Sequence, residues 1–126
     1  MSNLKVAEWV LRVAVSAEFI GHGVFALQGK KEWVAWFPTF GIDTSTALTL
    51  MVLIGLMDIA LGLLILVRPV RILVLWMALW AFWTALVRPI VGDSLWDFIE
   101  RGANWGAPLA LFLLLGFPRM FREWLK

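Results

Sequence analysis

Cysteine is absent from this chain of 126 residues, and so is tyrosine. Without cysteine the chain has no disulfide framework, no CxxC redox site and no thiolate metal site. Charged residues are scarce as well, at 16%, where a soluble domain carries roughly a quarter. The formal net charge is only +2 and no basic run is dense, so nucleic acid is not an expected partner.

Apolar residues are correspondingly abundant and make up 62% of the chain. A helix crossing a bilayer needs about 20 mostly apolar residues. Four runs approach this length, and they cover residues 6–27, 46–67, 70–87 and 103–117. Because backbone in lipid must satisfy its own hydrogen bonds, we predict an all-α fold, an integral membrane bundle of four transmembrane helices. Residues 1–126 form a single domain in this prediction.

The connections fit this division. The loop at residues 29–45 contains KKEWVAWF, where charges alternate with aromatic rings, which predicts a short interfacial segment. Pro89 is expected to end the third helix. The fourth run is short unless its helix begins near Leu95, where Ser94 and Asp97 fit a capping box. Such a helix would bend at a proline or a glycine, with candidates at Gly102, Gly106 and Pro108.

Lysine and arginine predict the orientation, because they gather on the cytoplasmic side of membrane proteins. One predicted side holds seven of them: Lys5, Arg12, Arg68, Arg71, Arg119, Arg122 and Lys126. The other side holds four: Lys30, Lys31, Arg88 and Arg101. Both termini are therefore expected to be cytoplasmic.

Polar residues interrupt the apolar runs at several points. Glu18 and His22, the only histidine, stand four residues apart and share one face of the first helix. Asp58 lies within the second run, about 18 Å from its start at 1.5 Å per residue. Arg88 ends the third run. Arg101, Asn104 and Trp105 precede or begin the fourth.

Two interpretations of this polar set stay open. Ionisable groups inside a membrane are costly and mark functional sites by default, which favours an outward-facing cavity. They can also act as structural clamps between helices, and one residue can be a clamp while another is functional. A third possibility is a different topology, in which some of these groups face water. A metal site built from His22, Glu18 and Asp58 is disfavoured because no tight motif supports it.

Glycines and aromatic residues complete the prediction. Gly55 and Gly62 are expected at a helix–helix contact, because a missing side chain allows close approach. The stripe of Trp76, Trp80 and Trp83 is more typical of packing or lipid contact than of a ligand site.

Several motifs together resemble the DoxX-like membrane proteins across most of the chain. They are Arg12 followed by EFIGHGVFALQGK, the loop residues Trp36, Phe37 and Gly41, the helix GLMDIALGLLIL and the late RGANWGAPLALFLLL. The resemblance implies a four-helix protein of the bacterial cytoplasmic membrane. It also implies similarity to the small subunit of thiosulfate:quinone oxidoreductase and to membrane partners of redox and sulfur-handling complexes.

The function expected from these observations is a quinone-associated subunit or partner of a membrane redox system. Glu18 and His22 are the candidate catalytic residues, as a proton relay. The candidate ligand-binding residues are Asp58, Arg88, Arg101, Asn104 and Trp105, while Phe25 and Trp83 could add flat walls. Quinone is the expected cofactor, with neither haem nor metal. The expected partners are the lipid bilayer and other membrane or redox subunits, and a homo-oligomer is left open.

The alternative is a non-enzymatic protein that holds a lipid or small hydrophobic ligand, or that scaffolds partner subunits. No cofactor motif shows that the chain catalyses a reaction by itself.

Overall fold

A computed structural model describes residues 1–126 and contains helices only. Three helices are long and apolar enough to cross a membrane: α1 (Asn3–Leu27), α3 (Thr44–Val67) and α4 (Arg71–Ile90). They confirm the first three predicted runs and extend each by a few residues. The shorter elements are α2 (Lys31–Val34), the 3₁₀ helix η1 (Phe37–Phe40), α5 (Leu95–Ile99), α6 (Gly102–Leu115) and α7 (Phe121–Trp124).

Side-chain caps fix the starts of three helices. Ser2 accepts a hydrogen bond from the backbone N–H of Lys5 at the start of α1, and Asp43 accepts one from Thr46 at the start of α3. Ser94 caps α5 by accepting from the N–H of Trp96. Each cap satisfies a backbone donor that the first turn of a helix leaves free. The predicted helix start at Leu95 is thereby confirmed.

The predicted end of the third helix was wrong, because α4 continues through Pro89 to Ile90. A proline so near a helix end removes only one hydrogen bond of the last turn. The terminator is Gly92, whose φ of 101° is a conformation that favours glycine. Its N–H donates to the carbonyl of Pro89, and the next N–H, from Asp93, donates to the carbonyl of Arg88.

The predicted fourth helix is interrupted. Its break lies at Glu100 and Arg101, just before Gly102, and both Gly106 and Pro108 lie inside α6. At 1.5 Å per residue the 14 residues of α6 extend about 21 Å, less than the roughly 30 Å of a hydrocarbon core. By length and composition, three helices qualify as membrane spans, not four.

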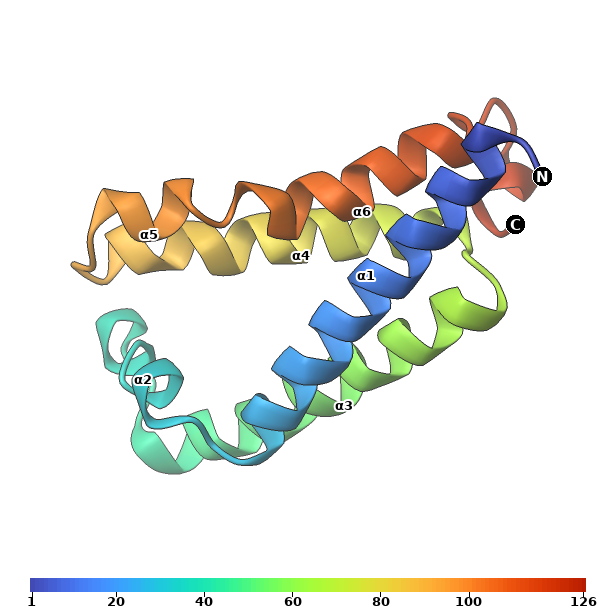
Figure 1. Ribbon diagram of the computed structural model, residues 1–126. Helices are drawn as coiled ribbons and strands as arrows, with labels where there is room; N and C mark the ends of the chain where they lie inside the picture. Colours follow the sequence, from blue (N-terminus) through green and yellow to red (C-terminus); the bar gives the residue numbers. More distant parts are fainter.

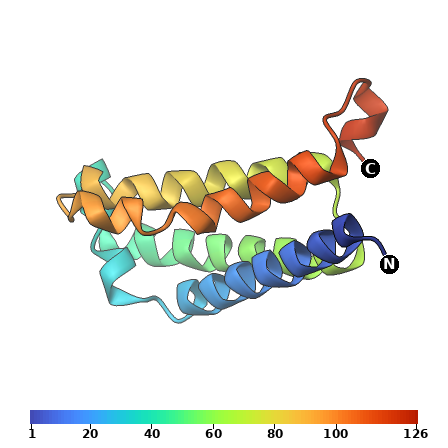
Figure 2. The same cartoon turned by 45° about the horizontal axis from the view of Figure 1, so that its top comes forward.

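The long helices form two arms (Figure 1). In the first arm α1 packs along α3, and in the second α6 packs along α4. Contacts between α1 and α6 join the arms, whereas α3 and α4 touch at few positions. The arms meet at the end that carries both chain termini, here called the closed end (Figures 1 and 2). They diverge toward the opposite, open end, where α2 and α5 lie.

Glycines hold the first arm together. A Cβ added to Gly55 would lie 2.8 Å from the carbonyl oxygen of Gly23, and one added to Gly62 would lie 2.8 Å from Cγ1 of Ile20 and 3.0 Å from the carbonyl oxygen of Ser16. No carbon atom fits at these distances without movement of the backbone. The predicted role of Gly55 and Gly62 in close helix approach is therefore confirmed, and Gly23 shares it.

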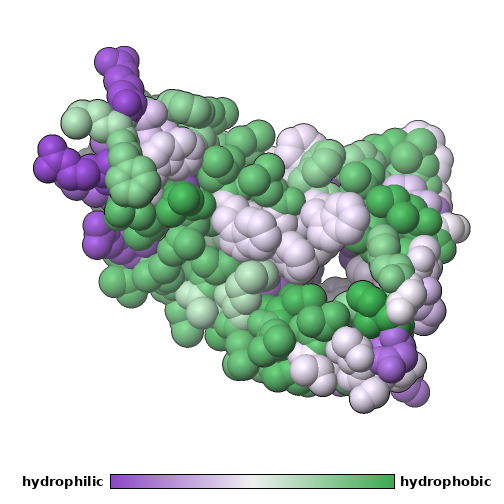
Figure 3. All heavy atoms as spheres, turned by 180° about the vertical axis from the view of Figure 1, so that it is seen from behind, coloured by the Kyte–Doolittle hydropathy of each residue, from purple (hydrophilic) through white to green (hydrophobic).

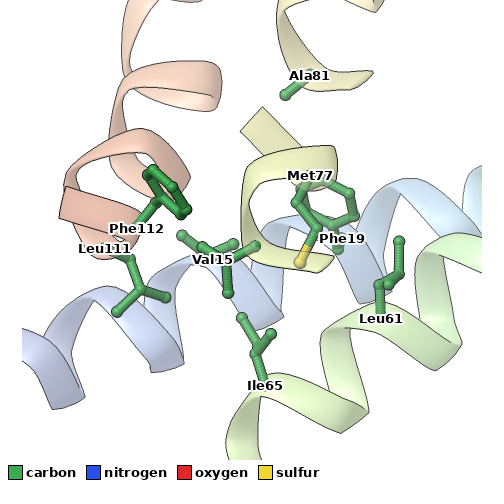
Figure 4. Close-up of a cluster of buried hydrophobic side chains, with 9 residues drawn as sticks. Val15, Phe19, Leu61, Ile65, Met77, Ala81, Leu111 and Phe112 are labelled. Carbon is green, nitrogen blue, oxygen red and sulfur yellow. The ribbon is translucent and has the colours of Figure 1, made fainter. Parts of the chain in front are cut away.

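A hydrophobic core joins the arms between the closed end and the middle of the molecule (Figure 4). All four of the helices that form the arms contribute to it, so it fixes their relative positions. Its nine buried members are Val15, Phe19, Leu61, Ile65, Val74, Met77, Ala81, Leu111 and Phe112.

Two arginines bind helix ends at the closed end. Arg12 is buried and donates from Nε to the carbonyl of Ile65 at 2.7 Å and from Nη2 to that of Leu66 at 2.6 Å. Arg71 donates from Nε to the carbonyl of Gly116 at 2.8 Å, just beyond α6. A cation at a helix C-terminus satisfies free carbonyls and complements the helix dipole. The sequence analysis counted Arg12 among the bases at this end and among the residues of the family resemblance, and its burial was not anticipated.

Candidate functional site

A cavity of about 380 Å³ lies between the arms. Phe19 and Ala81 belong both to its lining and to the hydrophobic core, so the core forms its floor toward the closed end. The lining is mostly apolar. Four helices also contribute polar side chains to it, and these are Glu18, His22, Asp58, Thr84, Arg88 and Asn104. Small-molecule sites in proteins typically combine an apolar wall with a few polar groups in this way.

Glu18 and His22 reach the cavity from one face of α1, as their spacing predicted. Both side chains are half-buried. The imidazole of His22 packs edge-on against the indole of Trp33, with ring centroids 5.7 Å apart. Three cations, Arg88, Arg101 and Lys30, are close enough to act electrostatically on His22.

Asp58 faces the same cavity from α3 and is buried, at 5% exposure. Its Oδ1 atom has no hydrogen-bond partner. The carboxyl is close enough to Glu18 for the two groups to interact electrostatically, and the indole of Trp80 approaches it from α4. A buried oxygen without a partner is rare in a folded protein, because it has lost its water and gained nothing in exchange.

Arg88 lines the cavity but does not pair with either carboxyl. Its Nη1 donates to the carbonyl of Thr84 at 2.6 Å, one turn back along α4. Its guanidinium also lies 4.7 Å from the ring centroid of Trp36, a cation–π distance. The salt bridges of the structure join other residues: Lys5 with Glu8, Arg12 with Glu8 and Arg101 with Glu100.

The sequence analysis placed Arg101 and Trp105 in the site as well, and the structure places both outside the cavity lining. Arg101 precedes α6 and turns back toward α5, where it donates to the carbonyl of Asp97 at 2.9 Å. Trp105 packs edge-on against Phe82 of α4. Successive helical residues point about 100° apart, so Trp105 cannot share the direction of Asn104, which does line the cavity.

Aromatic residues of the first loop form a part of the site that the sequence analysis missed. Trp33 and Trp36 come from α2 and the turn after it, and Phe37 and Phe40 from η1. Together these two elements, α2 and η1, form a roof over the open end of the cavity. Phe40 reaches across to Trp83 of α4, with ring centroids 6.2 Å apart. The only sequence signal was the density of aromatic residues in the loop, which we interpreted as contact with lipid headgroups.

The predicted aromatic walls differ from those observed. Trp80 and Trp83 line the cavity, while Trp76 stacks on Trp80 at 5.8 Å between ring centroids. Phe25 contacts Trp33 behind the lining rather than the cavity itself. The sequence analysis named Trp83 as a possible wall, whereas it described the stripe that includes Trp80 as more typical of packing or lipid contact.

The arrangement has a definite chemical character. Glu18 and Asp58 offer carboxyl groups, His22 and Asn104 offer groups that both donate and accept, and Arg88 offers a cation. Flat rings stand beside them in the roof and in α4. No group of three histidine, cysteine, aspartate or glutamate side chains lies close enough to hold a metal ion. Such a site suits a flat, partly polar organic molecule that forms hydrogen bonds with these side chains or exchanges protons with them.

Comparisons of the chain with protein-family profiles, with curated proteins and with solved structures give no match. The resemblance to DoxX-like proteins therefore stays a prediction from sequence motifs.

Proposed function

We propose that the chain crosses a bacterial inner membrane four times, with both termini in the cytoplasm. The interrupted segment α5–α6 spans residues 95–115 and runs beside α4 along its length (Figure 1). That is about the 20 residues that one crossing needs. The closed end carries both termini. The sequence analysis assigned seven of the eleven lysines and arginines to the side of the termini, which favours the closed end as the cytoplasmic one.

We further propose that the cavity binds a quinone and that the protein serves a membrane redox system, as its resemblance to DoxX-like proteins suggests. The observation that carries this proposal is the cavity itself, where ionisable groups and flat rings surround one space inside an apolar bundle. A quinone ring would stack on indole or phenyl faces. Its carbonyl oxygens would accept hydrogen bonds from His22, Asn104 or Arg88.

Reduction of a quinone to a quinol takes two electrons and two protons. In this proposal a membrane redox partner supplies the electrons, and the residues of this chain handle the protons. Glu18 and His22 stand one turn apart at the cavity wall, so a proton can pass between them and a bound oxygen. Asp58 is close enough to Glu18 to interact with it electrostatically, and its carboxyl is a second group that could pass a proton to the bound ligand.

A second candidate is a binding protein for lipid or another hydrophobic ligand, without redox chemistry. It is favoured by the composition of the lining, in which 12 of 18 residues are hydrophobic. The identity of the bound molecule separates the two candidates.

Ligand binding by the purified protein tests the proposal. Organic extracts of the protein would be analysed by mass spectrometry, and a quinone would be titrated while tryptophan fluorescence is recorded, since four tryptophans line the cavity. We expect saturable quenching in the wild type and binding weakened about tenfold in H22A, the loss of one hydrogen bond in an apolar site. The exposed Ser45→Ala is the control. A phospholipid in the extract with no response to quinone would favour the second candidate.

A further inference from the structure

The cavity is not closed evenly on all sides. Its floor is the hydrophobic core, and α1 with α6 packs along the side that faces the reader in Figure 1. The roof reaches α4 through Phe40 on Trp83 and through Trp36 on Arg88. The remaining side lies between α3 and α4, the two neighbouring helices that touch least.

The residues of that side belong to the cavity. Met51 and Ile54 reach it from α3, and Trp80 and Trp83 reach it from α4. Trp83 is both a lining residue and 41% exposed, so it stands where the cavity meets the outside. Figure 3 views the molecule from behind and shows a hollow between the two arms on this face.

The fold explains why this side stays open. The glycines of α3 face α1, so the close helix–helix contact of α3 is with α1, and α3 touches α4 at few positions. The two helices are connected only at the closed end, by the short turn before Arg71. From that turn they diverge along their length (Figure 1).

The surroundings of this opening are apolar. Exposed side chains beside it include Leu53 of α3 and both Trp76 and Leu79 of α4. In a membrane these helices would contact hydrocarbon, so the opening would face lipid tails rather than water. A molecule that used it would have to be dissolved in the bilayer.

We propose that the ligand is a tailed amphiphile that enters sideways from the bilayer between α3 and α4. Its polar ring lies in the cavity beside Glu18 and Asp58, and its apolar tail leaves through the opening into the lipid. This inference rests on the proposed function and narrows the ligand to quinones with a long hydrocarbon tail.

Single cysteines can test the opening, because the chain has none of its own. Leu53→Cys would place a thiol beside the opening, because Leu53 is exposed and lies on the side of Ile54 opposite Gly55, which faces α1. Val52→Cys is the matched control, because Val52 is exposed on the same helix and points about 200° away from the cavity-lining Ile54. Each variant in lipid nanodiscs would be labelled with a bulky membrane-permeant maleimide. Binding of a long-tailed benzoquinone and of the same ring without a tail would then be measured by tryptophan quenching.

Labelled L53C is expected to bind the tailed quinone at least about tenfold more weakly, because the label occupies the passage of the tail and a steric cost of about 1.4 kcal/mol already has that effect. Its equilibrium affinity for the tailless ring should change less than about threefold, while the rate of ring binding falls, because the label blocks entry but not the ring's seat. Labelled V52C should bind both ligands as the wild type does.

Unchanged binding of the tailed quinone by labelled L53C would overturn the inference. Equal loss of both ligands would also overturn it, because the label would then be filling the cavity rather than displacing a tail. If the unlabelled wild type bound neither quinone, the proposed function itself would fail, and this route with it.

Discussion

Asp58 is the residue whose surroundings are hardest to explain by stability alone. A clamp between helices needs a partner, yet Oδ1 of this buried carboxyl has none and no salt bridge includes it. The indole of Trp80 approaches the carboxyl from α4, but buried carboxyls that keep an unpaired oxygen and have no cation beside them lower the stability of a fold. Their retention in a cavity is more typical of a functional site.

Replacement of Asp58 separates the clamp from the functional site. D58N keeps the shape of the side chain and removes its charge, so we expect the melting temperature to stay constant or rise by a few degrees, which corresponds to about 1 kcal/mol. Quinone affinity should fall in the same variant. Thermal unfolding in detergent and quenching titrations measure the two effects. A fall in melting temperature of several degrees would mean that Asp58 is a structural clamp.

Arg88 shows how a side chain can satisfy itself locally. Its guanidinium could have reached a carboxyl across the cavity, but it folds back to the carbonyl of Thr84 and lies on the ring of Trp36. Both contacts cost little chain entropy, because one is within the same helix and the other is with the roof directly above. The two carboxyls of the cavity are thereby left without a cation in contact.

At the scale of elements, the contact between α1 and α3 determines the shape of the first arm. The backbones of the two helices are in contact at Gly23 and Gly55. A Cβ atom on either residue would lie 2.8 Å from the carbonyl oxygen of the other, so only glycine fits there. The close approach also aligns Glu18 of α1 with Asp58 of α3, so the packing of the arm places both carboxyls at the cavity.

Alanine substitution of two glycines tests this contact. Alanine favours a helix over glycine by about 1 kcal/mol, so G21A should raise stability slightly, because nothing lies within 4 Å of the added carbon. G55A should instead lower it, since the carbon would meet the carbonyl oxygen of Gly23 at 2.8 Å. Unfolding in detergent measures both. Equal stabilisation by the two substitutions would show that the arm is looser than the structure describes.

At the scale of the whole molecule, both termini lie at one end and the roof lies at the other (Figure 2). A chain that crosses the membrane an even number of times has both termini on the same side. The interrupted pair α5–α6 provides the fourth crossing in our proposal, although α6 alone is too short for one.

Cysteine labelling in intact cells tests the topology. Single cysteines at Ser2 and Lys126 should be protected from an impermeant maleimide, because both positions are at the closed end, which we assign to the cytoplasm. Cysteines at Thr44 and Asp93 should be labelled, because they lie at the open end. Labelling of Lys126→Cys together with protection of Ser2→Cys would show that α5–α6 does not cross the membrane.

The sequence alone determined the three long helices and the polar residues that lie within them. Apolar runs of membrane length must be helical, because lipid offers no partners to the backbone, so α1, α3 and α4 followed from composition. Helical periodicity is local, so the shared face of Glu18 and His22 could be predicted from spacing. The close-packing role of Gly55 could also be predicted from the sequence, because a glycine in a membrane helix allows a neighbouring helix to approach closely.

Only the tertiary structure decided how these elements surround a cavity. The roof of Trp33 and Phe40 could not be foreseen, because a loop near a membrane can lie on lipid or on protein with the same composition. The exclusion of Trp105 depended on the rotation of α6, which is set by where its helix begins after the break at Arg101. The opening beside Trp83 depends on which helices pack closely together. That choice depends on the surfaces of all the helices at once, so it cannot be predicted from any one segment of the sequence.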